Sequence, residues 1–324
     1  MRAVRCNQYG LPETLVVEEI ASPVPQTGEV LVSVKAAGVN FPDSLIIQNK
    51  YQIKPSLPFS PGGELAGVIK AVGEGVTRYR VGQSVIGFTG FGAFAEDAIV
   101  QQDNLVLMPT GMPFEIAGTF LMTYGTTYHA LKDRAQLAAG ETVLVLGAAG
   151  GIGLAAIEVA KALGARVIAA ASSDEKLAIC KQHGADETIN YLTDDLRERL
   201  KLLTQGRGVD VVCDPVGGRY SELALRSMAW RGRFLVVGFA DGDIPNIPLN
   251  LPLLKGCSVL GVFWGDYIRR EPQKAQADLA ELVALYGAGK IKPLVSGSYT
   301  LEGVGDALNA LMQRKVSGKI VVLP

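Results

Sequence analysis

The sequence predicts a two-domain α/β protein, in which an N-terminal all-β module is followed by a doubly wound parallel sheet. Three observations support this fold class. The chain has 324 residues, near the length at which one hydrophobic core divides into two. Residues 1–120 alternate short apolar stretches with turns rich in Gly, Pro and Asn. From about residue 124, apolar runs alternate with segments of helical spacing, which is typical of parallel strands joined by helices.

The composition narrows the class of protein. Hydrophobic residues make up 48% of the chain and charged residues 19%, an ordinary globular mixture. The net charge of −1 gives no support to nucleic-acid binding or to attachment to an acidic membrane surface. The four cysteines are scattered without a CxxC pair, which favours a reducing, intracellular setting. No signal peptide is visible, and the apolar runs are far shorter than the roughly 20 residues that span a bilayer. We therefore expect a soluble, cytoplasmic protein.

The first module is expected to form short strands in a small barrel. Its strands are predicted at residues 30–34, 66–72, 84–87 and 98–100. Six glycines crowd the stretch from residue 73 to residue 92, and turn chemistry in a tightly cornered barrel explains them.

The second module is expected to form a parallel sheet with helices on both faces. Bare apolar runs at 142–146 and 166–171 predict strands that are buried on both sides. Further strands are predicted at 209–213, 234–237 and 258–263, with helices at 154–163, 194–203, 221–229 and 271–288. A short helix at 304–313 and a last strand at 319–323 end the chain.

A glycine-rich turn follows the first strand of the parallel sheet. Glycines stand at positions 147, 150, 151 and 153, and a helix begins immediately after them. Small residues allow the backbone to approach a pyrophosphate, whose charge is met by the free N–H groups at the start of the helix. The strand, turn and helix together predict a dinucleotide-binding loop.

The end of the second parallel strand indicates which dinucleotide is bound. An NAD enzyme normally has Asp or Glu there, to accept hydrogen bonds from the ribose hydroxyls. Here Ser172 and Ser173 follow the strand, and Lys176 comes shortly after them. Two hydroxyls and an ammonium can bind a 2′-phosphate, so we expect NADPH. A helix N-cap at Ser172 or Ser173 would explain the acidic residues that follow, but not the missing carboxylate at the strand end.

Five stretches carry a family resemblance. They are Ala37-Gly-Val-Asn-Phe-Pro-Asp43, Pro61-Gly-Gly-Glu-Leu-Ala-Gly67, Gly147 to Gly153, Asp214-Pro-Val-Gly217 and the ending Gly318-Lys-Ile-Val-Val-Leu-Pro324. In this order they cover almost the whole chain, which resembles the medium-chain dehydrogenase/reductase superfamily and, within it, the zinc-free quinone oxidoreductase (zeta-crystallin-like) branch. The resemblance implies a GroES-like β-barrel catalytic domain at residues 1–123 plus 265–324, and a Rossmann NADPH-binding domain at residues 124–264.

The resemblance also implies that no metal is bound. Zinc members of the superfamily have a ligand cysteine where Asn40 stands here, and a histidine where Gly63 stands, beside a retained Glu64. They also have a four-cysteine lobe after the first hundred residues. This chain has no cysteine between Cys6 and Cys180. Because a catalytic zinc needs three protein ligands, we expect a zinc-free enzyme.

The implied reaction is reduction by hydride transfer. Without a Lewis acid, an electron-poor C=C bond or a quinone is easier to reduce than an alcohol is to oxidise. The resemblance therefore implies NADPH-dependent, zinc-independent reduction of quinones in a cleft between the domains. An alternative is an NADPH-dependent alkene reductase acting on enals, enones or enoyl thioesters, because Leu45 stands where some quinone reductases have a second cleft tyrosine. A third possibility is a catalytically idle NADPH-binding relative with a structural or RNA-binding role.

Three residues are implied to be catalytic. Asn40 would face the nicotinamide and the substrate oxygen, Tyr51 would lie over the substrate as a hydroxyl donor, and Thr126 would touch the nicotinamide ring. Taken alone, Asn40 fits a turn residue, and Tyr51 fits a loop anchor, at least as well. The intact glycine loop and the polar pair Asn40 and Tyr51 argue against an idle relative, and the near-neutral charge argues against RNA binding.

The implied cofactor contacts extend over both domains. Gly150, Gly151 and Ile152 would hold the pyrophosphate, and a second group would bind the 2′-phosphate. The full set is Asn40, Thr126, Gly150, Gly151, Ile152, Ser173, Lys176, Tyr191, Gly238, Phe239, Phe263 and Lys319. Tyr191, taken alone, would equally fit a half-buried strand residue.

The expected partners are a small-molecule substrate and a second copy of the chain. The apolar stretch between Ser258 and Phe263 is predicted to lie at the edge of the parallel sheet. An exposed hydrophobic edge favours pairing with another subunit, so we expect a homodimer.

Overall fold

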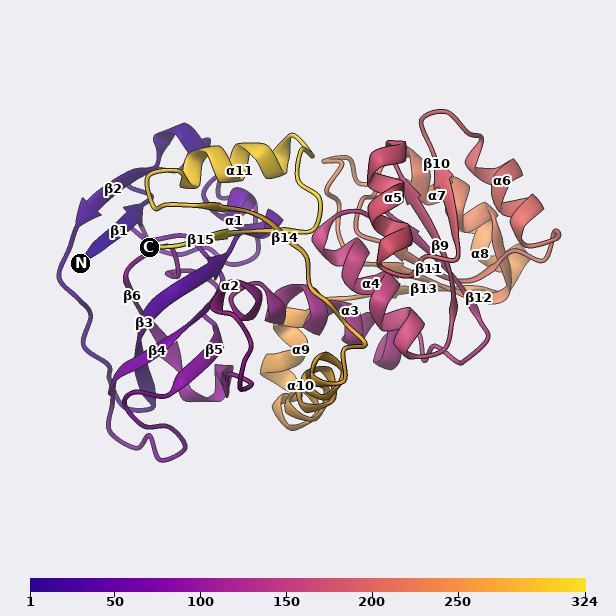
Figure 1. The fold of residues 1–324 in the computed structure, drawn as a ribbon. Helices are drawn as coiled ribbons and strands as arrows, with labels where there is room; N and C mark the ends of the chain where they lie inside the picture. The colour runs from indigo at the N-terminus through magenta and orange to yellow at the C-terminus, as the bar shows by residue number, and fades with distance from the viewer. The chain divides into compact units, whose positions relative to one another are not determined.

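The computed structural model describes residues 1–324, and the chain divides into two compact units (Figure 1). The first unit consists of Met1–Met122 and Leu294–Pro324, and the second of Thr123–Pro293. The expected return to the first domain at residue 265 is earlier than the division in the structure. Helices α9 (Trp264–Arg270) and α10 (Pro272–Gly287) group with the second unit, where Glu281 of α10 accepts a hydrogen bond from Lys132 at 2.7 Å.

A seven-stranded sheet forms the centre of the first unit. Its strand order is β14-β15-β3-β4-β5-β7, and β6 also pairs with β3. Only β14 and β15 are parallel, so the end of the chain returns to pair with β3 beside residues from the first forty. The strands are β3 (Glu29–Gly38), β4 (Glu64–Val72), β5 (Ser84–Phe88), β6 (Asp97–Gln101), β7 (Leu105–Leu107), β14 (Val295–Tyr299) and β15 (Lys319–Val322).

Smaller elements complete the first unit. A separate antiparallel pair is formed by β1 (Arg2–Arg5) and β2 (Val16–Glu19). The helices are η1 (Pro12–Thr14), α1 (Phe41–Ile46), η2 (Gln102–Asn104), α2 (Phe114–Ala117) and α11 (Val304–Met312). Apolar side chains of β3, β4, β5 and α11 pack into one buried core.

Two kinds of position explain the glycines expected at barrel corners. Gly75, Gly82, Gly90 and Gly92 have positive φ angles, which side-chain-bearing residues rarely adopt. At Gly73 the reason is space, because a Cβ atom there would lie 1.8 Å from the Gln26 carbonyl oxygen. The expectation that turn chemistry accounts for this cluster is confirmed at these positions.

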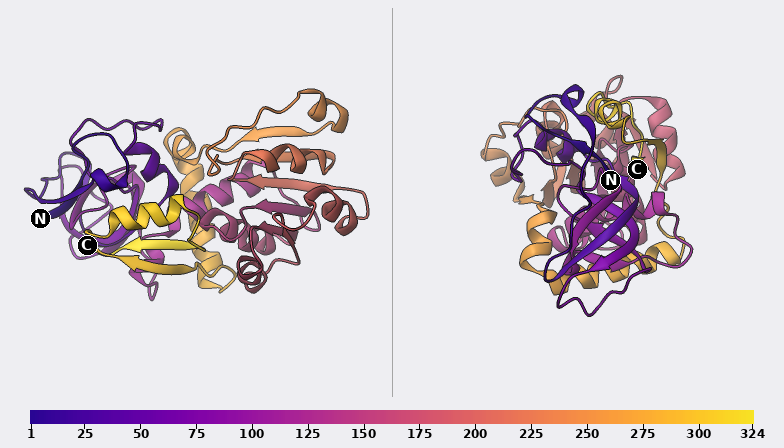
Figure 2. Two further views of the ribbon diagram at one scale, coloured as in Figure 1. Left: turned by 90° about the horizontal axis from the view of Figure 1, so that it is seen from above. Right: turned by 90° about the vertical axis from the view of Figure 1, so that its left-hand side faces the viewer.

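The second unit contains a six-stranded, all-parallel sheet, whose strands are also seen from above in the left view of Figure 2. Its order is β10-β9-β8-β11-β12-β13. From β8 the chain adds strands first on one side and then, starting with β11, on the other, so the order of addition reverses between β8 and β11 while all strands stay parallel. In doubly wound sheets, ligands bind outside the carboxyl ends of the strands at this reversal. The strands are β8 (Thr142–Leu146), β9 (Arg166–Ala171), β10 (Glu187–Asn190), β11 (Val209–Asp214), β12 (Met228–Val236) and β13 (Ser258–Gly261).

Helices cover both faces of this sheet. One set of alternating strand residues, including Leu144, Ile168 and Phe234, packs against α6 (Leu196–Leu203), α7 (Arg219–Arg226) and α8 (Asn250–Lys255). The other set, including Val145 and Ala169, is also buried and faces α4 (Gly151–Ala162). α5 (Asp174–Gln182) packs beside β9 and β10. The predicted doubly wound sheet is confirmed.

A helical segment at residues 121–134 contains two π-helical stretches. η3 (Leu121–Gly125) and η4 (His129–Arg134) flank the short α3 (Thr126–Tyr128). Gly125 has to be small, because a Cβ atom there would lie 2.7 Å from the Trp264 indole. π-Helical turns are rare and frequently occur at functional sites.

Several predicted elements have other bounds in the structure; the strand expected at 30–34, for example, is β3 and continues to Gly38. The helix expected at 221–229 is α7, which begins at Arg219 and ends at Arg226. The strand expected at 234–237 begins six residues earlier, at Met228. The early part of β12 bulges out of register with β11 and contains Arg231 with a φ of 61°, so its polar residues hid the strand. No helix of the protein is both long and apolar enough to cross a membrane.

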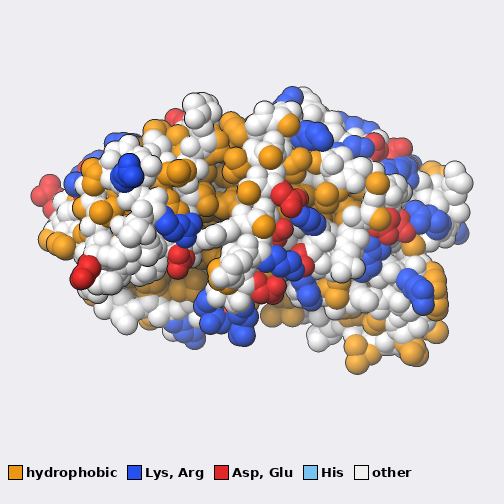
Figure 3. All heavy atoms as spheres, turned by 90° about the horizontal axis from the view of Figure 1, so that it is seen from below, with side chains coloured by type: hydrophobic (Ala, Val, Ile, Leu, Met, Phe, Trp, Pro, Cys, Tyr) orange, Lys and Arg blue, Asp and Glu red, His pale blue; other side chains and the backbone are white.

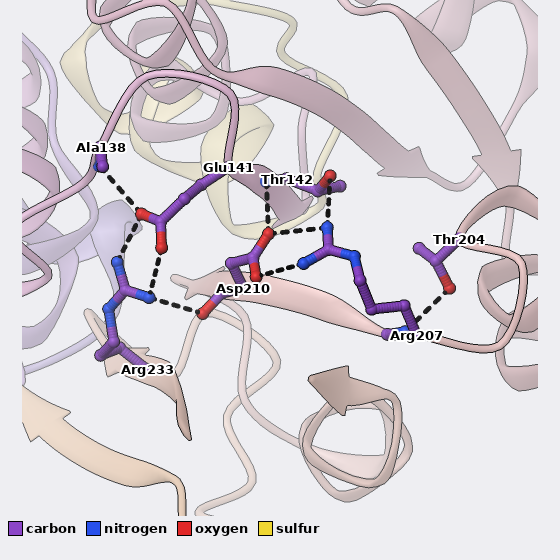
Figure 4. A network of polar contacts seen from close by, with 8 residues as sticks. Ala138, Glu141, Thr142, Thr204, Arg207, Asp210 and Arg233 are labelled. Atoms are coloured by element: carbon purple, nitrogen blue, oxygen red, sulfur yellow. Dashed lines mark hydrogen bonds and ion pairs between the residues drawn. The ribbon is translucent and has the colours of Figure 1, made fainter. Parts of the chain in front are cut away.

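A polar network joins the amino ends of three parallel strands (Figure 4). The Arg233 guanidinium of β12 donates to both carboxylate oxygens of Glu141, at 2.9 and 2.6 Å. Asp210 of β11 accepts from the Thr142 backbone N–H at 2.8 Å and from Arg207. These contacts fix the sheet at the edge opposite the carboxyl ends, which leaves the carboxyl ends for a ligand.

Candidate active site

Asn40 lies between β3 and α1 in the first unit. Its backbone is extended, and its N–H donates to Asp43 Oδ2 at 2.8 Å, which fixes the first turn of α1. The proline at position 42 suits the first helical turn, where its missing N–H costs nothing. Asn40 is 7% exposed, so the turn holds its amide almost entirely inside the unit.

The Asn40 amide belongs to a buried cluster with Glu64 and Lys319. Its Nδ2 donates to the Gly38 carbonyl oxygen at 3.2 Å and to Glu64 Oε1 at 2.8 Å. Its Oδ1 accepts from Lys319 Nζ at 2.5 Å. Lys319 Nζ also donates to the Val39 carbonyl oxygen at 2.7 Å and to Glu64 Oε1 at 3.3 Å.

Glu64 begins β4 and is fully buried. Its Oε2 accepts from the Met122 backbone N–H at 3.0 Å. Gly38 makes room for the carboxylate, because a Cβ atom at this position would lie 2.5 Å from Glu64 Oε1. A buried charge needs an opposite charge and hydrogen bonds, and Lys319 and Met122 meet both needs here.

This cluster limits what Asn40 and Lys319 can do. An amide has two N–H donors and an ammonium has three, and each of these donors has an acceptor within the first unit. The resemblance gave Asn40 a contact with the substrate oxygen and Lys319 a place in the cofactor groove. The structure gives every N–H donor of both residues an internal acceptor, so donation to a ligand by either one would replace a hydrogen bond within the unit. The expected contacts of Asn40 and Lys319 with substrate and cofactor stay predictions.

Asp43 and Tyr51 lie beside this cluster. Asp43 is completely buried, and burial raises the pKa of its carboxyl group to about 7. Tyr51 follows α1 in a loop and packs, half-buried, on the core of the unit. Burial, and then the charge of Asp43, raise the pKa of the Tyr51 phenol, which therefore stays protonated at neutral pH. No group of the first unit accepts a hydrogen bond from the Tyr51 hydroxyl, so its proton remains available.

The glycine loop of the second unit lies at the predicted place on the sheet. Gly147 follows β8 with a φ of 57°, and a Cβ atom there would lie 2.6 Å from a Val216 methyl, beyond the end of β11. Gly153 has no room for a side chain either, because the Gly147 carbonyl oxygen would lie 2.4 Å from it. Gly150 caps α4, and Gly151 and Ile152 begin it at a partly exposed surface. The Gly150 N–H donates to the Gly147 carbonyl oxygen at 3.0 Å, whereas the N–H groups of Gly151 and Ile152 have no preceding helical turn whose carbonyl oxygens could accept from them.

A second group of predicted residues gathers at the ends of β9 and β10. Ser173 is the N-cap of α5 and accepts from the Lys176 backbone N–H at 3.4 Å. Lys176 Nζ donates to Ser172 Oγ at 3.4 Å, so the ammonium lies over the end of β9. The Tyr191 N–H donates to the Ala171 carbonyl oxygen at 3.1 Å, which brings Tyr191 to the same edge. No carboxylate belongs to the last residues of β9 itself, but two lie at the start of α5: Asp174 Oδ1 accepts from Asn190 Nδ2 at 2.9 Å, and the Ser173 hydroxyl bonds to Glu175. The expected contact of Ser173, Lys176 and Tyr191 with a 2′-phosphate stays a prediction.

The turn after β11 supports the remaining part of the nucleotide site. Asp214 is buried and accepts from the N–H groups of Val216 and Gly217, both at 2.9 Å. Gly238, after β12, donates to the Asp214 carbonyl oxygen at 3.3 Å, and Phe239 lies against Gly217. Both therefore lie at the carboxyl edge, one strand from the reversal. Phe263 follows β13, the edge strand, and is 48% exposed.

Thr126 begins α3 between the two π-helical stretches and is half-buried. It belongs to the second unit, whereas Asn40 and Tyr51 belong to the first. The expected contact of Thr126 with a nicotinamide stays a prediction.

Two residues of the first unit had no assigned role in the sequence analysis. Glu64 was noticed only as a residue that zinc enzymes retain, and Asp43 only as part of a motif. Both are acidic residues inside apolar, glycine-rich stretches of the sequence. Because acidic residues are rarely buried without a partner, this pattern could have predicted a buried carboxylate with an opposite charge or a hydrogen-bond donor beside it. No three His, Cys, Asp or Glu side chains in the structure are arranged to hold a metal ion.

Comparisons with known proteins identify the family. Residues 26–110 match the family described as the alcohol dehydrogenase GroES-like domain, and residues 151–284 match the zinc-binding dehydrogenase family. Quinone oxidoreductase-like protein 2 of Bos taurus is 41% identical over 99% of this chain and 92% of its own length.

Solved structures of related proteins superpose on this chain over both of its domains. Escherichia coli quinone oxidoreductase complexed with NADPH is 31% identical and superposes with a TM-score of 0.93 over the whole of both chains. CurK enoyl reductase is 28% identical, with a TM-score of 0.90 over 99% of this chain and 98% of that one. With a GroES-like domain, a Rossmann domain and relatives of this similarity over its full length, the chain belongs to the quinone oxidoreductase branch of the medium-chain dehydrogenase/reductase superfamily.

Proposed function

We propose that this protein is an NADPH-dependent oxidoreductase that reduces quinones by hydride transfer without a metal ion. The observation that carries the proposal is the strand reversal, with a helix start at Gly151 beside it and with the Ser172 hydroxyl and the Lys176 ammonium at the end of β9. The NADPH-complexed E. coli relative supports the same cofactor. When bound, NADPH supplies the hydride.

The residues of the chain then have separate tasks. The N–H groups at the start of α4 bind the pyrophosphate, and Ser173, Lys176 and Tyr191 bind the 2′-phosphate. Reduction leaves negative charge on the substrate oxygen, and a hydrogen-bond donor lowers the energy of that charge. Tyr51 is the donor in this proposal, because its phenol stays protonated and has no internal acceptor. Asn40 and Lys319 keep their buried cluster with Glu64 and shape the site without giving up a proton.

A panel of substrates tests the reaction. We expect the protein to oxidise NADPH in the steady state with simple quinones as acceptors. Enals, enones and enoyl thioesters are measured in the same assay for comparison. The similarity to an enoyl reductase and the presence of Leu45 keep alkene reduction as the second candidate. Faster turnover of an enone or enoyl thioester than of every quinone would favour that candidate. Failure of the whole panel would contradict both.

Lys176 sets the preference for NADPH over NADH in this proposal. A charge-assisted contact to phosphate contributes on the order of 1.5–3 kcal/mol, so the unmodified protein should prefer NADPH at least tenfold. We expect Lys176→Ala to raise the Kd of NADPH about tenfold or more and to leave that of NADH nearly unchanged. Fluorescence titration with both cofactors measures this. Equal affinity for the two in the unmodified protein would exclude the assignment.

Activity should not depend on zinc. The positions of the family's zinc ligands hold Asn40 and Gly63, and Lys319 places a positive charge beside Glu64. A cation bound at this cluster would be repelled by the ammonium. We expect full NADPH oxidation after exhaustive chelation and no stoichiometric zinc by elemental analysis. Loss of turnover on chelation, restored by zinc, would refute this part of the proposal.

A homodimer is proposed through the edge strand β13. β13 ends the six-stranded sheet, and Val259 on it is 45% exposed. Helix α8, which precedes it, carries Leu253 and Leu254 at 77% and 70% exposure. Hydrophobic side chains also reach the surface at the lower right of Figure 3, in the second unit. An apolar edge of this kind pairs readily with its own copy about a twofold axis.

Sedimentation velocity tests the dimer. We expect the unmodified protein to sediment as a dimer at micromolar concentration and Val259→Asp to sediment as a monomer. Leu202→Asp is the matched control, because Leu202 is 66% exposed on α6, which is packed beside the opposite edge strand β10. Monomers of the unmodified protein, or equal loss of dimer in both variants, would contradict the assignment of the interface.

A further inference from the structure

Glu158 is a buried acidic residue in the middle of α4, the helix that begins at the glycine loop. It is 4% exposed, and three groups from three different segments contact its carboxylate. The Tyr124 hydroxyl of η3 donates to Oε2 at 2.7 Å, and the Lys292 backbone N–H, after α10, donates to the same oxygen at 2.9 Å. His183 Nδ1, at the C-cap of α5, lies 2.6 Å from Oε1.

Two of these partners lie in elements that carry predicted site residues. Tyr124 is two residues before Thr126, in the same helical segment. His183 ends α5, whose first turn carries Lys176 and whose N-cap is Ser173. Glu158 is itself seven residues after Gly151, about 10 Å along the helix that begins at the pyrophosphate site. One carboxylate of α4 thus contacts the two segments that carry Thr126 and Lys176, together with the chain after α10.

Burial of this carboxylate needs an explanation beyond packing. An ionised carboxylate inside a protein is costly, and well-packed apolar residues of similar volume often serve stability equally well. Hydrogen bonds, in contrast to apolar contacts, fix direction and distance. Burial and the neighbouring charge of Glu158 raise the pKa of Tyr124 well above its usual value, so its hydroxyl remains a donor over the whole working pH range. The three contacts therefore hold η3, α5 and the chain after α10 in one arrangement around α4.

We propose that Glu158 is a positioning residue for the cofactor: through Tyr124 it fixes the turn that carries Thr126, and through His183 it fixes the helix that carries Ser173 and Lys176. This inference rests on the proposed function, because it uses the proposed roles of these three residues. Tyr124 would act on the nicotinamide end of the cofactor and His183 on the 2′-phosphate end. Substitutions of these two residues should therefore have different effects.

Single variants of the two partners separate these effects in the full-length protein. Tyr124→Phe should slow hydride transfer from NADPH to p-benzoquinone about tenfold and leave the Kd of NADPH within about twofold, because it disturbs only the reacting end. His183→Leu should raise the Kd of NADPH about fivefold and leave that of NADH unchanged, because it disturbs only the 2′-phosphate end. His183→Asn keeps a donor near the position of Nδ1 and should restore NADPH binding.

A matched control removes the same kind of hydrogen bond elsewhere. The Tyr267 hydroxyl donates to Asp278 at 2.7 Å in the second unit, and neither residue carries a site group. Tyr267→Phe should lower the melting temperature about as much as Tyr124→Phe does, without slowing hydride transfer. If the two variants had the same kinetics, or if His183→Leu weakened NADPH and NADH equally, Glu158 would be purely structural and the inference would be wrong. Failure of Lys176→Ala to discriminate between the cofactors would instead refute the proposed function.

Discussion

Replacing Lys319 by methionine is expected to destabilise the first unit by about 3–5 kcal/mol, because it leaves the Glu64 carboxylate buried without its cation. The Glu64 side chain is fully buried and that of Lys319 is 9% exposed, so solvent cannot replace the lost ammonium. The Asn40 Oδ1 atom and the Val39 carbonyl oxygen would lose a donor as well. Urea unfolding followed by far-UV circular dichroism measures the loss.

The two units can be followed separately in this experiment. Both tryptophans, Trp230 and Trp264, belong to the second unit, so their fluorescence should change little in Lys319→Met while the circular dichroism midpoint falls. The matched control is the double variant Lys319→Met with Glu64→Gln, which removes the uncompensated charge. We expect it to recover part of the lost stability. If the single variant were as stable as the unmodified protein, the ion pair would contribute nothing to the first unit.

The parallel sheet was the part of the fold most open to prediction. Strands β8 and β9 begin and end at the predicted residues, because each is a short apolar run that is buried on both faces and bounded by polar residues or glycine. α10 was predicted to within one residue at each end, since its apolar residues recur at helical spacing over sixteen residues. The secondary structure of such segments follows from the local spacing of their apolar residues.

Elements that depend on distant partners were predicted less well. Before its apolar end, β12 contains Arg231 and Arg233, which are typical of a loop in the sequence. In the structure Arg233 donates to Glu141, more than ninety residues earlier in the chain. α9 and α10 belong to the second unit because side chains such as Glu281 bond to the segment at residues 121–134, and no local pattern shows that. The π-helical stretches of that segment have no sequence signal, since they depend on packing such as that between Gly125 and Trp264.

The candidate site follows the same division. The glycine loop and the end of β9 were found from the sequence, because both depend on the backbone and on neighbours in the chain. The commitment of Asn40 to internal hydrogen bonds was not, because its partners Glu64 and Lys319 come from strands 24 and 279 residues away. The resemblance names Asn40 and Lys319 as site residues, and those roles stay predictions. Only the geometry reveals that their N–H donors already have internal acceptors, which adds support for Tyr51 as the proposed hydrogen-bond donor.

Tyr51→Phe is expected to slow the reduction of enones about a hundredfold or more, the usual cost of removing a donor to a developing oxyanion. Hydride addition to a conjugated carbonyl leaves charge on oxygen, and the Tyr51 phenol, whose pKa is raised by burial and then by the charge of Asp43, is the proposed donor to that charge. Quinones should suffer far less, because their reduced anions are stable enough to take a proton from water. The affinity for NADPH should not change, since the substitution alters no group of the second unit. Steady-state rates with both substrate classes, and a cofactor titration, measure these effects.

A second tyrosine of the first unit separates proton donation from loop anchoring. The Tyr9 hydroxyl donates to the Pro55 carbonyl oxygen at 3.1 Å, in the loop that follows Tyr51. If Tyr51 acts only as an anchor of this loop, Tyr9→Phe and Tyr51→Phe should weaken activity on quinones and enones to a similar, small extent. If Tyr51 donates the hydrogen bond, only Tyr51→Phe should discriminate between the two classes. If Tyr51→Phe kept full activity on every substrate, water would have to be the proton source. The N–H donors of the Asn40 amide and of the Lys319 ammonium already have internal acceptors.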